Sequence, residues 1–168
     1  MKVLNRQPDY IISSGLKEII ERTKIKKSFS KIFASEYYYD QYGAPQYPKL
    51  VVTDTVKTQF LFRINKGREG LSESINEYMD EAHRPIPFSN IIYIGDGMTD
   101  VPCMTVTVKN GGYAIAVFNP KKKVRGLNIC KELFKGARVD YVARADYRSN
   151  SELDKFLKIT LKKPIPLR

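Results

Sequence analysis

A short apolar run at residues 91–94 ends in Gly95-Asp96-Gly97, and a second aspartate, Asp100, follows four residues after Asp96. An apolar run of this length, bounded by glycine, is typical of a buried strand. The glycines on both sides of Asp96 permit a tight turn and a close approach of the backbone to another group. The pattern therefore predicts a strand at residues 90–94 that delivers a carboxylate to its carboxyl end.

The Asp96-Gly97 pair also permits a different interpretation, because Asp-Gly between apolar runs is a strong signal for a β-hairpin. Pro102 and the polar stretch before Tyr113 argue against an immediate return of the chain as a second strand. We therefore favour a strand followed by a loop, with the hairpin as the alternative.

Similar short apolar runs alternate with helical patterns along the chain, which predicts an α/β fold: a Rossmann-like, mostly parallel sheet flanked by helices. Strands are expected at residues 10–13, 31–34, 90–94, 113–118 and 140–143, and helices at 16–22, 56–66, 124–135 and 151–161. Residues 36–52 are expected to form a hairpin or flap that turns at Gly43, and residues 68–89 a polar insertion. Ligands bind at the carboxyl ends of strands in such sheets. Candidate site residues are therefore Ser14-Gly15, Asp96-Gly97 and Asn119-Pro120.

The composition indicates a single globular domain, residues 1–168, since 42% of the residues are hydrophobic and 28% are charged. No apolar run approaches the roughly 20 residues of a transmembrane helix, so no membrane association is expected. The first nine residues lack the apolar segment of a signal peptide. Two cysteines do not make a disulfide framework, so a cytoplasmic location is expected and both are expected to be core thiols.

The net charge of +11 raises the question of an anionic partner. The densest basic cluster is Lys121, Lys122, Lys123 and Arg125. No recognition helix, zinc-finger spacing or aromatic RNA-binding signature accompanies it, so nucleic acid is not the expected partner. A solvated basic face is the favoured interpretation, and a phosphate-rich ligand or nucleic acid are the alternatives.

Two further features resemble parts of a phosphate site. Ser14 and Gly15 follow an apolar run and precede a helical pattern, where a hydroxyl and free N–H groups can bind an anion. Ser14 could equally be a helix N-cap. Lys57 lies in the first turn of the helix expected at 56–66, on the same face as Phe60 and Ile64. A lysine there needs an anionic partner, unless its stem only covers the core while the ammonium group reaches water.

The order of these three signals resembles the haloacid dehalogenase-like (HAD) superfamily, in its phosphoserine-phosphatase-like branch. The resemblance runs from Tyr10 to Pro120 and is carried by Ser14-Gly15, Lys57 and Gly95-Asp96-Gly97 with Asp100. It implies a Mg²⁺-dependent phosphohydrolase that acts on a small phosphorylated substrate, in line with the general logic of phosphoryl transfer.

The resemblance also implies a role for each residue. Ser14 and the backbone of Gly15 would bind the phosphoryl oxygens, and Lys57 would neutralise charge on the phosphoryl group. Asp96 would bind Mg²⁺ directly, and Asp100 would hold the water shell of the metal or the lysine.

The chain departs from the family in one essential respect, because the family's nucleophile and acid/base lie in an Asp-x-Asp motif and no Asp-x-Asp occurs here. Asp54 follows an apolar run and is the nearest substitute. The acid/base position would then be Val56, which cannot transfer a proton. Asp54 is better explained as a favourable anion near a helix N-terminus.

The missing motif belongs to a central strand of the family fold, and most of the family's cap is absent as well. The chain is therefore expected to be a truncated or split phosphohydrolase that is inactive alone. The alternative is a degenerate HAD module that binds a phosphorylated ligand or a partner protein without catalysis.

Loss of the central strand would leave two strands with unpaired edges, and such edges are templates for pairing. We expect the gap to close by direct pairing of the two strands, or the chain to associate with itself or with an N-terminal fragment. Sedimentation velocity tests the association, and a monodisperse monomer with a cooperative thermal transition and no vacant edge would argue against it.

Overall fold

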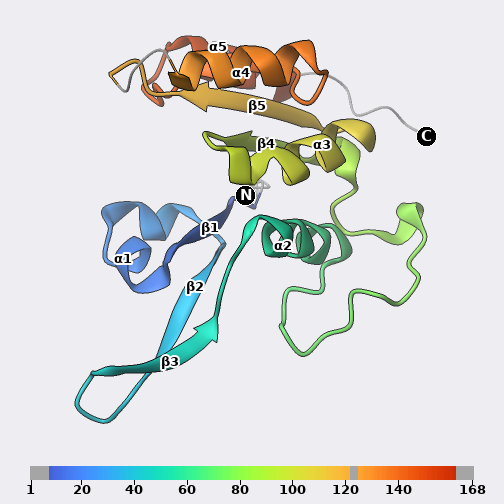
Figure 1. The fold of residues 1–168 in the computed structure, drawn as a ribbon. Coiled ribbons are helices and arrows are strands. Elements are labelled where there is room, and N and C mark those ends of the chain that lie inside the picture. The colour runs from blue at the N-terminus through green and yellow to red at the C-terminus, as the bar shows by residue number, and fades with distance from the viewer. Residues whose placement is uncertain (1–7, 122–124, 162–168) are drawn as a thin grey trace, which may run out of the picture. The chain divides into compact units, whose positions relative to one another are not determined.

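The computed structural model describes residues 8–121 and 125–161 and has an α/β architecture with two three-stranded sheets (Figure 1). The chain divides into two compact units, residues 1–60 and 61–168, and the division falls inside helix α2 (Asp54–Lys66). The helices and parallel strands expected from the sequence are thus confirmed in outline. The strands form two sheets instead of the one expected, and the described pairings do not include direct pairing of the strands at 10–13 and 90–94.

The first unit holds one sheet, in the order β1-β2-β3, formed by β1 (Tyr10–Leu16), β2 (Lys31–Tyr39) and β3 (Pro45–Leu50). β1 and β2 are parallel, and between them lie the short helix α1 (Lys17–Glu21) and the 3-10 helix η1 (Lys24–Ser28). β2 and β3 are antiparallel. The two outer strands of this sheet are therefore β1 and β3.

The hairpin expected at residues 36–52 is confirmed, and its turn is organised by Asp40. One carboxylate oxygen of Asp40 accepts hydrogen bonds from the backbone N–H groups of Tyr42 and Ala44. Gly43 has a φ of +81°, a conformation that glycine adopts without steric cost. The tyrosines of this hairpin are exposed, and Tyr38 packs on Tyr47 across the two strands.

Helix α2 begins where Thr53 caps it, since the backbone N–H of Val56 points at the Thr53 hydroxyl and that of Lys57 donates to the Thr53 carbonyl. In its first half Phe60 is fully buried and stacks on Phe33 of β2 at 4.5 Å between ring centroids. The helix ends at Gly67, whose φ is +64°, as the sequence predicts.

The second unit holds a parallel sheet in the order β4-β5-β6, formed by β4 (Ile92–Gly95), β5 (Tyr113–Phe118) and β6 (Tyr141–Arg144). Helices α3 (Val101–Lys109), α4 (Arg125–Lys135) and α5 (Glu152–Leu161) connect and cover these strands. Leu153 of α5 is buried in a core cluster with Ile115, Val117 and Ala143. The ring of Phe156 stacks on that of Tyr141 at 4.0 Å.

The segment between Asp96 and Tyr113 differs from the expectation of a polar stretch, because it contains the 3-10 helix η4 (Met98–Asp100) and α3. Pro102 lies in the first turn of α3, where a missing N–H costs nothing. Val101, Cys103, Met104 and Thr107 are buried along one side of the helix. Tertiary packing therefore makes a helix from β-branched residues of low helix propensity. The hairpin interpretation of Asp96-Gly97 is wrong, since β4 and β5 are parallel.

The polar insertion at 68–89 has only two short 3-10 helices, η2 (Glu81–His83) and η3 (Phe88–Asn90). Its backbone is held by cationic side chains. The buried guanidinium of Arg63 donates to the carbonyl oxygens of residues 68, 70, 71 and 73. Lys66 donates to the carbonyls of Ile75 and Glu77, and Arg68 to that of Ser74. The insertion is thus fixed without regular secondary structure.

We expect Leu153→Ala to lower the free energy of unfolding by about 2–5 kcal/mol, because it leaves a cavity in the core under α5. Ile159→Ala on the same helix is the matched control, since Ile159 is 62% exposed, and it should change the free energy by less than about 0.5 kcal/mol. Urea denaturation followed by circular dichroism measures both, and equal effects would contradict this packing.

Candidate active site

The carboxyl ends of β4, β5 and β6 meet at one edge of the parallel sheet, with Gly95 paired to Ala116 and Phe118 to Arg144. Asp96 follows β4 directly, so the structure places it at this edge, as the sequence predicts. The chain then turns through η4, which brings Asp100 back beneath the end of β4. Asp96 and Asp100 therefore belong to one compact loop.

Asp100 is 6% exposed and is held by two groups of its own loop and strand. The hydroxyl of Tyr93 donates to one carboxylate oxygen at 2.8 Å, and the backbone N–H of Gly97 points at the other at 3.3 Å. Burial above all, with Cys103 and Asp100 close by, raises the pKa of Tyr93, so its hydroxyl stays protonated as a donor. Through these two hydrogen bonds the buried Asp100 fixes the conformation of the loop.

The two glycines around Asp96 have different physical roles. A Cβ at Gly95 would lie 2.7 Å from the Cβ and the carboxyl carbon of Asp100, too close for two carbon atoms. A Cβ at Gly97 would have no neighbour closer than 3.7 Å, and the φ of Gly97, −137°, is ordinary extended backbone. A side chain is therefore excluded at Gly95, where Asp100 approaches the backbone closely, but not at Gly97.

Asp96 influences two groups on neighbouring elements. Burial first, and then the negative charge of Asp96, raise the pKa of the Cys130 thiol on α4. The pKa of the Tyr147 hydroxyl, in the loop after β6, is raised by the same two causes in the same order. Cys130 is buried and its Sγ lies 3.8 Å from the carbonyl oxygen of Val117. The core position expected for both cysteines is confirmed.

Ser14 and Gly15 lie in the first unit, at the end of β1, which continues to Leu16. The Gly15 N–H donates to the hydroxyl of Ser13 at 3.0 Å, and the Ser14 carbonyl accepts from Ser35. Leu16 occupies the N-cap position of α1, which has only five residues. Ser14 is therefore not a helix N-cap, and its exposed side chain lies beside the strand end rather than at a long helix.

Lys57 also lies in the first unit and is 6% exposed. It shares its buried face with Phe60, as the periodicity predicts. Lys57 is buried as a whole residue, and burial of a charge requires a polar or anionic partner. Lys57 is therefore an internal residue of the first unit and not part of its solvated surface.

Asp54 is exposed in the first turn of α2, where it accepts a hydrogen bond from the N–H of Thr55. This is the favourable placement of an anion at a helix N-terminus. This structural role is sufficient to explain the position of Asp54.

Within residues 8–121 and 125–161 no group of three or more histidine, cysteine, aspartate or glutamate side chains is arranged to hold a metal ion. Mg²⁺ usually keeps several waters and binds through one or two carboxylates together with substrate phosphates. Asp96 fits the role of a single direct ligand of this kind. Asp100, whose carboxylate accepts a hydrogen bond from Tyr93, fits a position outside the direct ligands, next to the metal's water shell.

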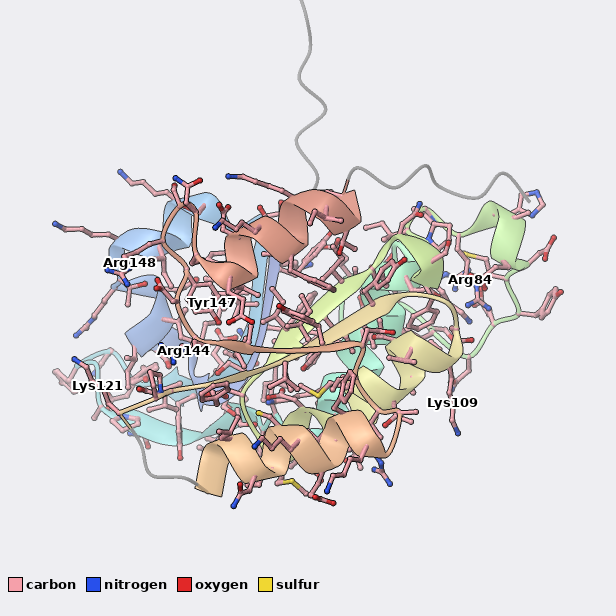
Figure 2. All side chains as sticks on the ribbon, turned by 90° about the horizontal axis from the view of Figure 1, so that it is seen from above. Arg84, Lys109, Lys121, Arg144, Tyr147 and Arg148 are labelled. Atoms are coloured by element: carbon pink, nitrogen blue, oxygen red, sulfur yellow. The ribbon has the colours of Figure 1, made fainter. Side chains whose placement is uncertain are left out.

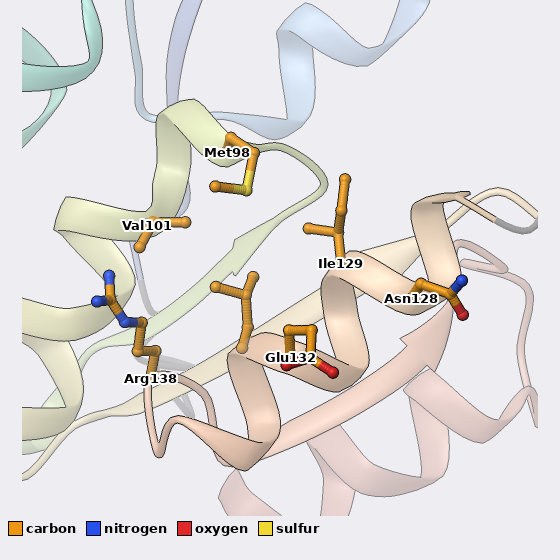
Figure 3. Close-up of a pocket in the computed structure, with 7 residues that line it drawn as sticks. Met98, Val101, Asn128, Ile129, Glu132 and Arg138 are labelled. Carbon is orange, nitrogen blue, oxygen red and sulfur yellow. The ribbon is translucent and has the colours of Figure 1, made fainter.

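A largely apolar groove of about 670 Å³ adjoins the same loop (Figure 3). It lies between η4 and α3 on one side and α4 on the other. The residues lining it are Met98, Val101, Asn128, Ile129, Glu132, Leu133 and Arg138. Met98 belongs to the Asp96 loop, but Asp96 does not line the groove. The groove therefore lies beside the candidate site and is not part of it.

Comparison with known proteins finds a relative that the chain matches in part. An uncharacterized protein of Borreliella burgdorferi is 34% identical over an alignment of 162 residues that covers 86% of this chain and 54% of that protein. The chain therefore spans about half the length of the relative it matches. No protein-family profile and no solved structure matches the chain.

Across the described residues, no helix combines the length and the apolar character needed to cross a membrane.

Sequence reasoning did not find Tyr93, Cys130 or Tyr147 as neighbours of the two aspartates. Tyr93 carries a weak signal, because a tyrosine inside an apolar strand needs a partner for its hydroxyl. Cys130 and Tyr147 carry none, since they reach the loop from α4 and from the segment after β6.

We expect Gly95→Ala to destabilise the second unit by about 1–3 kcal/mol, because the new methyl group overlaps Asp100. Gly97→Ala is the matched control two residues away and should change the free energy of unfolding by less than about 0.5 kcal/mol. Chemical denaturation of both variants tests the role of the close approach, and a well-tolerated Gly95→Ala would show that the loop does not depend on it.

Proposed function

We propose that this chain is part of a HAD-type, Mg²⁺-dependent phosphohydrolase that acts on small phosphomonoesters, and that it is inactive alone. The observation that carries the proposal is the Asp96 loop. An aspartate stands at the carboxyl end of a parallel strand, and a second, buried aspartate fixes the loop that holds it. Ligand sites of α/β sheets lie at such strand ends.

The other motif residues support the proposal by their chemistry. Ser14 presents an exposed hydroxyl at the end of another parallel strand, β1. Lys57 is a buried cation, suited to neutralising a phosphoryl group. Phosphoryl transfer depends on positioning and charge neutralisation, and residues of these types supply both.

In this proposal each residue has a defined task. In the first unit, the Ser14 hydroxyl would donate to a phosphoryl oxygen and Lys57 would balance phosphoryl charge. In the second unit, Asp96 would hold Mg²⁺, which would neutralise phosphate charge, and Asp100 keeps the loop of Asp96 in position. The chain supplies no Asp-x-Asp, so the nucleophile and the proton donor must come from another segment.

The edges of the two sheets support the need for such a segment. Within the described residues, β1 and β4 are each the outer strand of a sheet, and each carries motif residues at its carboxyl end. An outer strand presents unpaired backbone groups that can accept another strand. β3, the other outer strand of the first sheet, contains Pro45 and Pro48, which cannot donate to a neighbour.

The second candidate function is a non-catalytic module that binds a phosphorylated ligand or a partner protein. The absence of Asp-x-Asp from the sequence favours it. It would retain phosphate binding through Ser14 and Lys57, with Mg²⁺ bound weakly by Asp96.

The test measures two properties of the purified chain, hydrolysis of p-nitrophenyl phosphate with MgCl₂ and binding of inorganic phosphate by calorimetry. We expect no hydrolysis above background, and phosphate binding that Mg²⁺ strengthens. Asp96→Asn should abolish the Mg²⁺ effect, because it removes the direct carboxylate ligand. Asp54→Asn, which removes the same charge from an exposed aspartate, should leave that effect unchanged.

Two results would contradict parts of the proposal, and a third would decide between the two candidate functions. Hydrolysis that disappears in Asp54→Asn would identify Asp54 as a nucleophile and contradict the requirement for another segment. Phosphate binding that is indifferent to both Mg²⁺ and Asp96→Asn would contradict the metal site. Restoration of hydrolysis by a longer form of the chain that includes an Asp-x-Asp strand would separate the phosphohydrolase from the non-catalytic module.

A further inference from the structure

Basic side chains gather at the same edge of the second unit as Asp96. Lys121 follows β5, Arg144 is the last residue of β6, and Arg148 follows in the next loop. The strand register pairs Arg144 with Phe118, three residues before Lys121. Figure 2 shows Lys121, Arg144, Tyr147 and Arg148 at one end of this unit, and Arg84 and Lys109 at the other.

The three cations differ in how their charge is balanced. Arg148 forms a two-contact pair with Asp146, at 2.8 and 2.7 Å, and this pairing lowers the pKa of Asp146 to about 2. Lys121 and Arg144 are exposed, and neither side chain has a hydrogen-bond or ion-pair partner among residues 8–121 and 125–161. Two positive charges at this edge are therefore left uncompensated.

The loop after β6 also approaches Asp96. Tyr147 lies in this loop and is exposed, and burial first and then the charge of Asp96 raise the pKa of its hydroxyl. The backbone N–H of Ala145 donates to the carbonyl of Phe118 at 2.8 Å, which ties the start of this loop to the end of β5. Gly95 pairs with Ala116 and Phe118 with Arg144, so the cations and Asp96 lie at the same edge of the parallel sheet.

We propose that Lys121 and Arg144 bind a second anionic group of the substrate, so that the substrate class is phosphomonoesters with a further phosphate. This inference rests on the proposed function, which assigns the reacting phosphate to Asp96. A phosphate carries a charge of about −1.5 to −2 at neutral pH, which the two uncompensated cations match. Arg144 adds a planar guanidinium that suits bidentate contact with phosphate oxygens.

The same observations argue for a small ligand over a nucleic acid. At this edge, within residues 8–121 and 125–161, the uncompensated cations are Lys121 and Arg144, which lie at or just after the ends of two adjacent strands. Tyr147 is the one aromatic side chain in the loop after β6, whereas binding of single-stranded nucleic acid uses several aromatic side chains on which successive bases stack.

The experiment compares two sugar phosphates that differ by one phosphate, fructose 6-phosphate and fructose 1,6-bisphosphate. Each is titrated by calorimetry into the full chain with MgCl₂ at moderate salt. The bisphosphate should bind about tenfold more tightly than the monophosphate, the effect of one added charge-assisted contact. The double substitution Lys121→Gln with Arg144→Gln should reduce this ratio to less than about twofold and leave monophosphate binding unchanged.

The matched control is Lys109→Gln with Arg138→Gln. It removes the same charge from two exposed residues that precede the amino ends of β5 and β6. The ratio of the two affinities should be unchanged in this variant. If both double variants lower bisphosphate affinity equally, general charge attraction explains the binding and the inference is overturned.

Asp96→Asn separates failure of this inference from failure of the proposed function. If both sugars bind equally tightly and Asp96→Asn weakens both, the second-phosphate site is wrong and the proposed function stands. If neither sugar binds, or Asp96→Asn changes neither affinity, the proposed function fails and the inference fails with it. Tighter binding of a 5′-phosphorylated oligonucleotide, lost only in the Lys121 and Arg144 variant, would assign this edge to nucleic acid and overturn the proposal.

Discussion

The hydrogen bond from Tyr93 to Asp100 is the interaction on which the candidate site depends. It joins a residue inside β4 to a residue beyond the turn, so the strand and the following loop hold each other. A buried carboxylate that lost this donor would keep its desolvation cost without compensation. Asp100 is fixed and Gly95 lets it approach, whereas Asp96 is exposed. In the proposed function the two aspartates therefore have different roles, with Asp96 as the direct metal ligand and Asp100 as the residue that fixes the loop.

The sequence predicts the regular parts of the fold well, where local pattern and tertiary environment agree. β5 has the bounds expected from its apolar run, and Gly67 ends α2 as its position indicates. The sequence does not predict α3, because its valines and threonines disfavour a helix and only burial against the sheet stabilises one. The sequence also predicts too early an end for β1, since pairing with β2 extends the strand past Ser14 to Leu16.

The candidate site shows the same limit. The positions of Asp96 at a strand end and of Lys57 on a buried helix face follow from periodicity and are confirmed. The inward orientation of Asp100 does not follow, because it depends on a tyrosine hydroxyl seven residues earlier in the chain. The electrostatic effects of Asp96 on Cys130 of α4 and on Tyr147 after β6 are non-local, and no spacing in the sequence encodes them.

The basic character of the chain has more than one physical origin. Lys121 and Arg144 are exposed and uncompensated, but Arg63 is 4% exposed and is surrounded by backbone carbonyls. Arg63, Lys66 and Arg68 together replace the backbone hydrogen bonds that a helix or a sheet would give to the segment after α2. Loops usually tolerate insertions and deletions because little depends on their register. Here each of several carbonyls must meet a particular nitrogen atom, so a change of even one residue in length would misalign the set. This irregular segment would therefore be as intolerant of length variation as a strand in the middle of a sheet.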